Sequence, residues 1–482
     1  MHKQRLINQL STSYENRVLI LDRDSFYTLF DYADLLKELG YEVLYYDDVE
    51  HFRFIYETEI RNADKKIAIV SLRDYYIPYD IRRAFYEVSL ALDTIYPKLN
   101  AGVVRTYIDD IGLIDFTYDA LYEDAETVKQ TESFIKTKVF SPENIMRFLT
   151  LASKELEDDI SLVATHTDWV EIARRNAKLE VYAARIGISR SQQKINEKFE
   201  EFVFDGYQKL SGVMSKSYPA ILPKVIDTIA NGKTAIVVAD GMSLFDFEII
   251  SKQLNGFTYE YGNSYAMIPT TTSISRQSLL SGKYPQQLDN PFSLAKEENG
   301  FYEAAANYGY GKQHTFYGRG YEAIPGPLVR FAAIIINDID DMVHGQKQGR
   351  QGMYNDISLF AKTGKLQELF SKLLDAGFAV YLTSDHGNTH CIGRGSVKRT
   401  GVETETKSKR MIVLKDFAEA SDELLERTVV YPGYYMDKSY QYLICKGNTS
   451  FDNKNDEVMT HGGMSIEEVI VPFVKIRRNE NG

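Results

Sequence analysis

The stretch Ala235-Ile236-Val237-Val238-Ala239-Asp240-Gly241 is an apolar run that stops abruptly at a carboxylate and a glycine. A short, β-branched run without polar alternation is typical of a strand that is buried on both faces of a helix-covered parallel sheet. Ligands of such sheets bind in the crevice outside the carboxyl ends of the strands, so Asp240 is expected at a functional site. The structural alternative is a carboxylate that caps the following helix.

The same pattern returns twice downstream, in the segments Phe331–Asp340 and Phe378–Gly387. Each segment is an apolar run that leads into acidic or imidazole side chains, such as Asp385 and His386 in the second. Helix capping alone does not account for three such strands. The sequence therefore predicts an α/β fold whose strand ends carry a site.

Length, composition and charge limit the classes of function. At 482 residues the chain is longer than one hydrophobic core, so two or three domains are expected. Its 44% hydrophobic and 26% charged residues are ordinary for a folded protein. The net charge of −12 argues against a general nucleic-acid coat or an anionic membrane surface as partner, because both need a basic protein surface.

The two cysteines, Cys391 and Cys445, argue against a disulfide framework and favour a reducing compartment. Cys391 follows His390, but without a second cysteine-rich partner this pair is interpreted as a bystander rather than a metal site. The N-terminus has no long apolar region, and no apolar run reaches the roughly 18 residues of a membrane span. The protein is therefore expected to be cytoplasmic, with no membrane partner.

The N-terminal part alternates strands and helices. Strands are predicted over Val18–Asp22, Glu42–Tyr46 and Lys66–Ser71, and helices over Phe26–Leu39 and about 80–92. This βαβα alternation implies a small, Rossmann-like parallel sheet.

A receiver domain is one interpretation of this N-terminal region, since Asp22 and Asp24 follow the first strand as clustered acids. That chemistry also needs an aspartate directly at the end of the third strand. Ser71 occupies this position and Asp74 comes three residues later. A docking or scaffold domain is therefore the favoured interpretation.

The pattern turns helical after residue 126, and Pro219, Pro223 and Gly232 then mark a boundary. Three domains are predicted: a small α/β domain over 1–126, a helical region over 127–230 and a catalytic domain over 231–482.

Five motifs of the C-terminal half contain the candidate catalytic and metal-binding residues. They are the segments Pro269-Thr270-Thr271-Thr272-Ser273-Ile274-Ser275-Arg276, Leu279-Leu280-Ser281-Gly282-Lys283-Tyr284-Pro285, Asp385-His386 and Thr460-His461-Gly462-Gly463, together with Asp340 and His344 four residues apart. In this order and spacing, from Thr234 onward, the chain resembles the alkaline phosphatase superfamily, and most closely the PglZ-domain proteins. Singly, each motif also has a structural interpretation, as a surface helix pair, a loop contact or a helix cap.

The resemblance implies an alkaline-phosphatase-like sheet with helices on both faces and two divalent metal ions, usually zinc, beside a threonine nucleophile. It implies that one ion is held by Asp340, His344 and His461, and the other by Asp240, Thr272, Asp385 and His386. Thr272 is the favoured nucleophile, from its distance to Ser281-Gly282, and Thr270 is the alternative.

General chemistry supports this set. A hydroxyl is a poor nucleophile near neutral pH and needs a metal to stabilise its alkoxide, while a second metal holds the phosphoryl oxygen and the leaving group. Carboxylate and imidazole ligands suit zinc or manganese.

Three further residues are candidates around this set. Arg276 lies one helical turn beyond Thr272 and is predicted to bind a substrate phosphate, with a surface arginine as the alternative. Asp338 and Asp341 neighbour Asp340 and could support or replace it, since the register at strand ends slips by a residue or two.

Two basic stretches, from Gln346 to Arg350 and from Arg394 to Arg410, could attract a polyanionic substrate, although a solvated loop is nearly as good an interpretation. The expected function is hydrolysis of phosphoric esters, with phosphodiesters, oligonucleotides and cyclic nucleotides as substrate classes. The segments Leu21–Asp24 and Ile77–Asp80 are similar to PglZ proteins of bacteriophage-exclusion loci, which implies an antiphage setting with protein partners. The alternative is a non-catalytic or regulatory metal-binding component of a defence complex.

Overall fold

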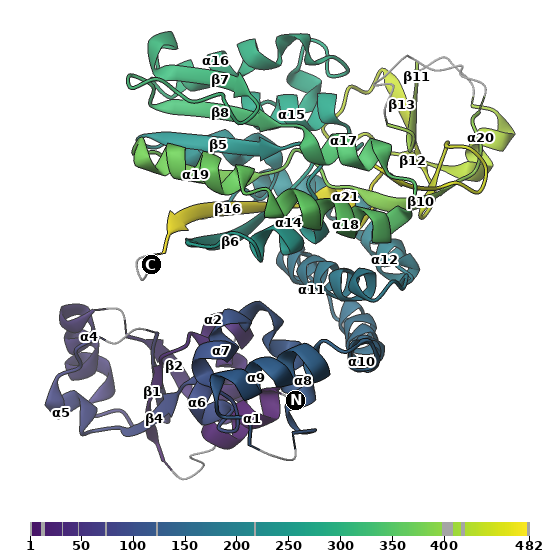
Figure 1. The fold of residues 1–482 in the computed structure, drawn as a ribbon. Helices are drawn as coiled ribbons and strands as arrows, with labels where there is room; N and C mark the ends of the chain where they lie inside the picture. Colours follow the sequence, from purple (N-terminus) through teal and green to yellow (C-terminus); the bar gives the residue numbers. More distant parts are fainter. Residues whose placement is uncertain are drawn as a thin grey trace. The chain divides into compact units, whose positions relative to one another are not determined.

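A mixed six-stranded sheet, in the order β6-β16-β9-β5-β8-β7, lies at the centre of the C-terminal half of the computed structural model (Figure 1). The strands β7, β8, β5 and β9 are parallel to one another, and β16 is antiparallel to both β9 and β6. The strand bounds are β5 (Thr234–Ala239), β6 (Phe257–Tyr265), β7 (Thr315–Arg319), β8 (Phe331–Ile336), β9 (Ala379–Thr383) and β16 (Ile470–Arg478).

The structure describes residues 2–10, 15–30, 32–46, 48–72, 75–121, 124–215, 218–397, 408–415 and 420–479. The chain divides into two compact units, Met1–Phe148 and Leu149–Gly482. The division falls within α10 (Pro142–Ile160), so it does not address how residues 127–230 fold. The three predicted domains, 1–126, 127–230 and 231–482, stay a prediction.

Side chains of β5 alternate between two hydrophobic cores. Ala235 and Val237 pack with the helices α14, α18 and α19, which Figure 1 shows together on one face of the sheet, whereas Ile236 and Val238 pack with α13, α15 and α16. All six residues of β5 are buried. A sheet with helices on both faces and a central strand buried on both sides confirms the predicted α/β class.

Helices precede β5, the first strand of this sheet in sequence, and follow its strands along the chain. Their bounds are α11 (His166–Arg185), α12 (Gln193–Asp205), α13 (Val225–Ile229), α14 (Leu244–Ser251), α15 (Thr272–Ser281), α16 (Glu297–Asn307), α17 (Asp338–Gly345), α18 (Gly349–Lys362), α19 (Lys365–Asp375), α20 (Asp422–Arg427) and α21 (Ile466–Val469). Two small sheets, ordered β14-β10-β15 and β11-β13-β12, come between β9 and β16. Their strands are β10 (Thr389–Gly393), β11 (Met411–Lys415), β12 (Thr428–Tyr431), β13 (Tyr440–Cys445), β14 (Thr449–Ser450) and β15 (Glu457–Thr460).

The N-terminal unit contains a four-stranded parallel sheet in the order β2-β3-β1-β4. Its strands are β1 (Arg17–Asp22), β2 (Glu42–Tyr45), β3 (Ile67–Ser71) and β4 (Tyr86–Leu90). Its helices are α1 (His2–Leu10), α2 (Phe26–Phe30), α3 (Ala33–Glu38), α4 (Val49–Ile55), α5 (Tyr79–Arg82), α6 (Leu92–Ile95), α7 (Ala101–Thr106), α8 (Ile111–Tyr118) and α9 (Val128–Phe134). The predicted small parallel sheet is confirmed.

Two predicted helices of this unit are wrong in part. The segment predicted as a helix over about 80–92 contains the edge strand β4, because Tyr86, Val88 and Leu90 alternate with polar residues and pair with β1. The helix predicted over Phe26–Leu39 is two shorter helices, α2 and α3.

Asp22 and Asp24, considered above as receiver acids, both accept structural hydrogen bonds. Asp22 is buried and accepts from the backbone N–H of Phe26 at 2.8 Å and of Tyr27 at 2.7 Å. Asp24 accepts from the backbone N–H of Leu92 at 2.7 Å. Asp74 lies outside the described residues. These contacts match helix-capping carboxylates.

Asp22→Ala is therefore expected to destabilise the N-terminal unit by about 1.5–3 kcal/mol, because it removes a charged acceptor from buried donors. Faster hydrogen exchange of the β1 amides would measure the loss. Asp64→Ala, which changes an exposed aspartate of the same unit, is the control. Equal exchange in both variants would contradict a capping role for Asp22.

Candidate metal centre

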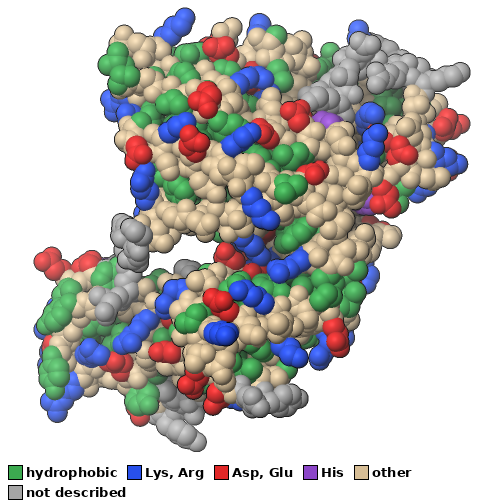
Figure 2. Space-filling view, viewed as in Figure 1, with side chains coloured by type: hydrophobic (Ala, Val, Ile, Leu, Met, Phe, Trp, Pro, Cys, Tyr) green, Lys and Arg blue, Asp and Glu red, His purple; other side chains and the backbone are tan. Residues whose placement is uncertain are grey.

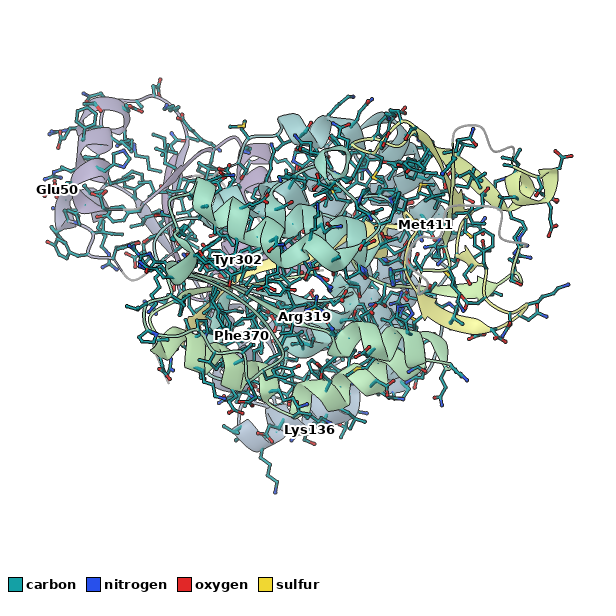
Figure 3. The ribbon with its side chains drawn as sticks, turned by 90° about the horizontal axis from the view of Figure 1, so that it is seen from above. Glu50, Lys136, Tyr302, Arg319, Phe370 and Met411 are labelled. Atoms are coloured by element: carbon teal, nitrogen blue, oxygen red, sulfur yellow. The ribbon has the colours of Figure 1, made fainter. Side chains whose placement is uncertain are left out.

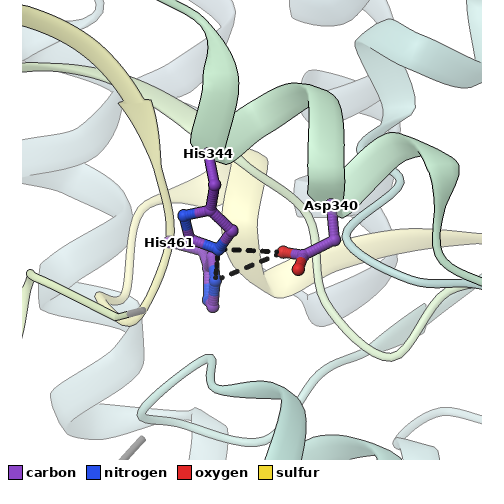
Figure 4. A group of neighbouring side chains, drawn as sticks. All are labelled: Asp340, His344 and His461. Carbon is purple, nitrogen blue, oxygen red and sulfur yellow. Dashed lines mark hydrogen bonds and ion pairs between the residues drawn. The ribbon is translucent and has the colours of Figure 1, made fainter. Parts of the chain in front are cut away.

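Asp340, His344 and His461 face one another (Figure 4). Asp340 and His344 lie one turn apart on α17, and His461 follows β15. His344 Nε2 is 3.2 Å and His461 Nε2 is 3.5 Å from Asp340 Oδ1, and the two Nε2 atoms are 3.1 Å apart. One carboxylate oxygen and two imidazole nitrogens therefore converge, which is a ligand set that suits zinc.

Asp240, Asp385 and His386 form a second such group where β5 and β9 end. Asp240 Oδ1 is 3.7 Å and Asp385 Oδ2 is 3.9 Å from His386 Nε2. Both carboxylate oxygens are buried, and neither has a hydrogen-bond partner among the described residues. Buried carboxylate oxygens in this state need a positive charge, so the group fits a divalent cation.

The pKa values of Asp385 and Asp340 are shifted by burial and by neighbouring charges. Burial and the neighbouring Asp240 carboxylate raise the pKa of Asp385 well above its ordinary value. Burial opposes ionisation of Asp340 as well, but the hydrogen bond with His344 and the charge of His461 hold the pKa of Asp340 well below its ordinary value. The Asp240 and Asp385 carboxylates thus repel one another, and Arg276, which lies beside both, offsets only part of this repulsion.

Backbone carbonyls orient two of the three histidines. Nδ1 of His461 lies 2.9 Å from the carbonyl oxygen of Thr270, and Nδ1 of His386 lies 3.0 Å from that of Gly387. A carbonyl can only accept, so Nδ1 carries the hydrogen in both rings. Nε2 of the neutral ring then presents its lone pair to the ligand group, which is the tautomer that metal binding requires.

Thr272 is the first residue of α15, and its hydroxyl lies beside the second group. Its Oγ1 is 3.0 Å from His386 Nε2, and the side chain is buried. A helix N-terminus also favours negative charge at this position. Among the threonines of the segment, Thr272 therefore has the hydroxyl next to the candidate ligands.

Thr270, the alternative nucleophile, uses its hydroxyl in the loop that follows His461. Its Oγ1 donates to the carbonyl oxygen of Gly463 at 3.0 Å and accepts from the N–H of Gly462 at 3.1 Å. Gly462 has a φ of +104°, and a Cβ there would lie 1.7 Å from Oγ of Ser408, so glycine is required. These contacts favour a structural role for Thr270.

Arg276 is buried among carboxylates. Its Nε donates to Glu297 at 2.7 Å, its Nη1 donates to Asp240, and Nη1 lies 3.9 Å from Asp385 Oδ2. Burial lowers the pKa of Arg276, but Asp240 and Glu297 outweigh this effect and raise it. The predicted contact of Arg276 with a substrate phosphate stays a prediction.

Two side chains that the sequence analysis missed connect the strand ends. Ser384 Oγ lies 2.7 Å from the carbonyl oxygen of Ala239 and 2.6 Å from that of His386. Asn388 donates from Nδ2 to the carbonyl oxygen of Gly241 at 2.9 Å. They hold the loop that contains Asp385 against the loop that contains Asp240. Their positions one residue before Asp385 and two after His386 were the signal available in the sequence.

The neighbours of Asp340 lie outside the group. Asp338 Oδ1 is 4.0 Å from Lys365 Nζ, and Asp341 is exposed on α17. Of the three aspartates, Asp340 is the one that joins His344 and His461.

Two of the arginines predicted to attract a polyanion are buried. Arg410 forms an ion pair with Glu468, and Arg350 Nε lies 3.7 Å from Glu180 Oε2. Neither presents charge to solvent, so the basic-surface prediction is wrong for both. Lys398, Arg399 and Lys407 lie outside the described residues. On the face of the C-terminal unit seen in Figure 2, Lys and Arg side chains are interspersed with Asp and Glu.

Residues 323–476 match the family described as PglZ, the BREX system PglZ alkaline phosphatase-like domain. The matched range contains Asp340, His344, Asp385, His386 and His461, and begins after Asp240 and Thr272. No curated protein matches the chain. None of the described helices is both long and apolar enough to cross a bilayer.

Several solved structures are similar at low identity. Murine ectonucleotide pyrophosphatase/phosphodiesterase 5, in an inactive form with AMP, is 13% identical with a TM-score of 0.34, over 51% of this chain and 88% of that chain. Phosphonoacetate hydrolase from Sinorhizobium meliloti 1021, with phosphonoformate, is 11% identical with a TM-score of 0.34, over 51% and 90%. Human ectonucleotide pyrophosphatase/phosphodiesterase 5 is 14% identical with a TM-score of 0.33, over 50% and 87%.

Proposed function

Because the chain contains a PglZ alkaline phosphatase-like domain, we propose that it is a two-metal phosphoric-ester hydrolase with Thr272 as nucleophile. The observation that carries this proposal is the convergence of two buried ligand groups beside the Thr272 hydroxyl. The family description places the domain in the BREX system, which supports a role in antiphage defence with protein partners from that system.

Asp340, His344 and His461 would hold one ion, and Asp240, Asp385 and His386 would hold the other together with Thr272. When bound, two such ions activate the hydroxyl and neutralise the charge that develops on the phosphoryl and leaving-group oxygens. Zinc suits these nitrogen and oxygen ligands, and manganese is the second candidate.

The chain itself contributes position and charge. Thr272 Oγ1 would lose its proton to water and form a bond to phosphorus as the bond to the leaving oxygen breaks, and the leaving oxygen would take a proton from water. A water molecule would then attack phosphorus, break the bond to Oγ1 and return a proton to Thr272. The N-terminus of α15 favours the negative phosphoryl group at this point. Ser384 and Asn388 keep the two ligand loops together during both steps.

The substrate class is tested by a screen of metal-loaded protein against chromogenic mono- and diesters, cyclic nucleotides and oligonucleotides. Phosphodiesters are expected to be hydrolysed fastest. The competing hypothesis, a non-catalytic or regulatory component of a defence complex, predicts no turnover on any of them and a stable protein partner in pull-down.

Removal of metal is expected to abolish hydrolysis reversibly. Dialysis against a chelator should reduce the rate by at least about 100-fold, because the hydroxyl then has no ion to stabilise its alkoxide. Re-addition of zinc or manganese should restore the rate, and calcium should not, since it prefers all-oxygen sites. A rate that survives complete chelation, verified by elemental analysis, would contradict a metal-dependent mechanism.

A further inference from the structure

Glu297 is a buried carboxylate that belongs to neither ligand group. It is the first residue of α16 and is 2% exposed. Its Oε2 accepts from Arg276 Nε at 2.7 Å. Its Oε1 accepts from the hydroxyl of Tyr317 and from Arg319 Nη2 at 3.1 Å. A fully hydrogen-bonded buried carboxylate of this kind is a fixed point from which other groups can be oriented.

Arg276 connects Glu297 to Asp240. The guanidinium uses Nε for Glu297 and Nη1 for Asp240 Oδ2. The other oxygen of Asp240, Oδ1, is the one that faces His386 Nε2 at 3.7 Å. One oxygen of Asp240 is thus held by Arg276, and the other is turned toward the second ligand group.

The charges of these side chains give Glu297 a role beside Arg276. A buried arginine beside Asp240 and Asp385 would repel a divalent cation if its charge were uncompensated. Glu297 pairs with a different nitrogen of the guanidinium, Nε, and helps to compensate that charge. Arg276 can therefore orient Asp240 by hydrogen bonding with a smaller electrostatic penalty for the ion.

The series of contacts that starts at Asp240 ends on the strand β7. Tyr317 and Arg319 are two residues apart on this strand, which places both on one face. Figure 3 labels Arg319, whose side chain is half-exposed. The contacts thus run from a surface strand to a metal-ligand carboxylate through Glu297 and Arg276.

We propose that Glu297 and Arg276 are positioning residues that orient Asp240 for the metal ion at Asp240, Asp385 and His386, and that Tyr317 and Arg319 fix Glu297. This inference rests on the proposed function, because it requires that metal site. It assigns Arg276 a role distinct from the predicted contact with a substrate phosphate.

The test measures zinc affinity of the full-length chain by competition with a chromophoric chelator. Glu297→Gln keeps the size of the side chain and removes its charge. It is expected to weaken binding of one of the two ions by roughly 10–100-fold, as changes to residues that support metal ligands do. Repeating the titration in a His344→Ala background, which lacks the other site, assigns the effect to the Asp240 group.

Glu303→Gln is the matched control. Glu303 lies on the same helix, and its carboxylate pairs with Lys283 at 3.1 Å on the surface. Zinc binding should be unchanged in this variant. If Glu297→Gln does not fold by circular dichroism, Tyr317→Phe replaces it, since that variant removes a single donor from Glu297 at a partly buried site. It is expected to weaken zinc binding in the same direction and by less.

Three results would overturn the inference. The positioning role would be excluded if Glu297→Gln bound zinc as tightly as Glu303→Gln does. The same holds for Tyr317→Phe where that variant is used instead. A loss confined to the Asp340 group would also exclude this role. Unchanged zinc binding in Arg276→Lys together with weaker inhibition by inorganic phosphate would assign Arg276 to substrate instead. Wild-type protein that binds no zinc would instead end the proposed function, so the two failures are distinguishable.

Discussion

Thr272→Ala is expected to reduce phosphodiester hydrolysis by about three orders of magnitude or more, because it removes the group that would attack phosphorus. The Thr272 hydroxyl is 3.0 Å from His386 Nε2 and lies at the N-terminus of α15. The fold should remain, since the change deletes a hydroxyl and a methyl group from a site beside the ligands. Initial rates with a chromogenic bis-phosphate ester measure the effect.

Neighbouring threonines provide the controls for this experiment. Thr271→Ala changes an adjacent buried threonine whose hydroxyl has no hydrogen-bond partner among the described residues, so its effect should be small. Thr272→Ser retains a hydroxyl and should recover much of the rate. Activity of Thr272→Ala within tenfold of wild type, with loss of activity in Thr270→Ala, would move the nucleophile to Thr270.

The central sheet was predictable because its strands have a local signature. β5 and β8 are short runs in which every residue is buried, and a strand covered by helices on both faces cannot carry polar alternation. The candidate ligand Asp240 directly follows β5, and the candidate ligand Asp385 follows β9 after one residue, Ser384. Chain topology brings the carboxyl ends of parallel strands together, so residues far apart in sequence meet there.

The contacts of Glu297 with Arg276 and Arg319 were not predictable in this way. Glu297 on α16 lies 21 residues from Arg276 on α15, and its other partner Arg319 lies on the strand β7. No periodicity or spacing relates these positions, since their contacts depend on how α15, α16 and β7 pack. For Arg276, the sequence indicated only a position one helical turn from Thr272. That position is compatible with phosphate binding and also with an ion pair to Asp240.

The prediction of a helix at the edge strand β4 was wrong for a different reason. Tyr86–Leu90 is one of the five-residue strands of the chain, and the preceding Tyr79–Arg82 forms a single helical turn. Over so short a segment, the apolar positions of residues 80–92 fit a helix. They fit a short helical turn followed by a strand equally well. Pairing with β1, which is a tertiary interaction, decides between them.

Loss of metal from variants of the ligand groups is the second large effect expected. Purified wild-type protein should carry about two zinc or manganese ions per chain, one for each ligand group. Asp385→Ala and His461→Ala remove members of different groups, so each should lose about one ion, and the double variant should lose both. Elemental analysis of the full chain after dialysis measures the content.

The two losses have different physical origins, and this makes the comparison informative. Asp385 is buried, and its Oδ1 accepts from the N–H groups of Gly241 and His386, so its replacement also loosens the loop that contains His386. His461 contributes a ring whose Nδ1 is fixed by the carbonyl of Thr270, so His461→Ala should leave the Asp240 group intact. His390→Ala, a histidine outside both groups that lies 3.6 Å from Glu457, should retain the wild-type content. Unchanged metal in both Asp385→Ala and His461→Ala would show that neither group binds an ion.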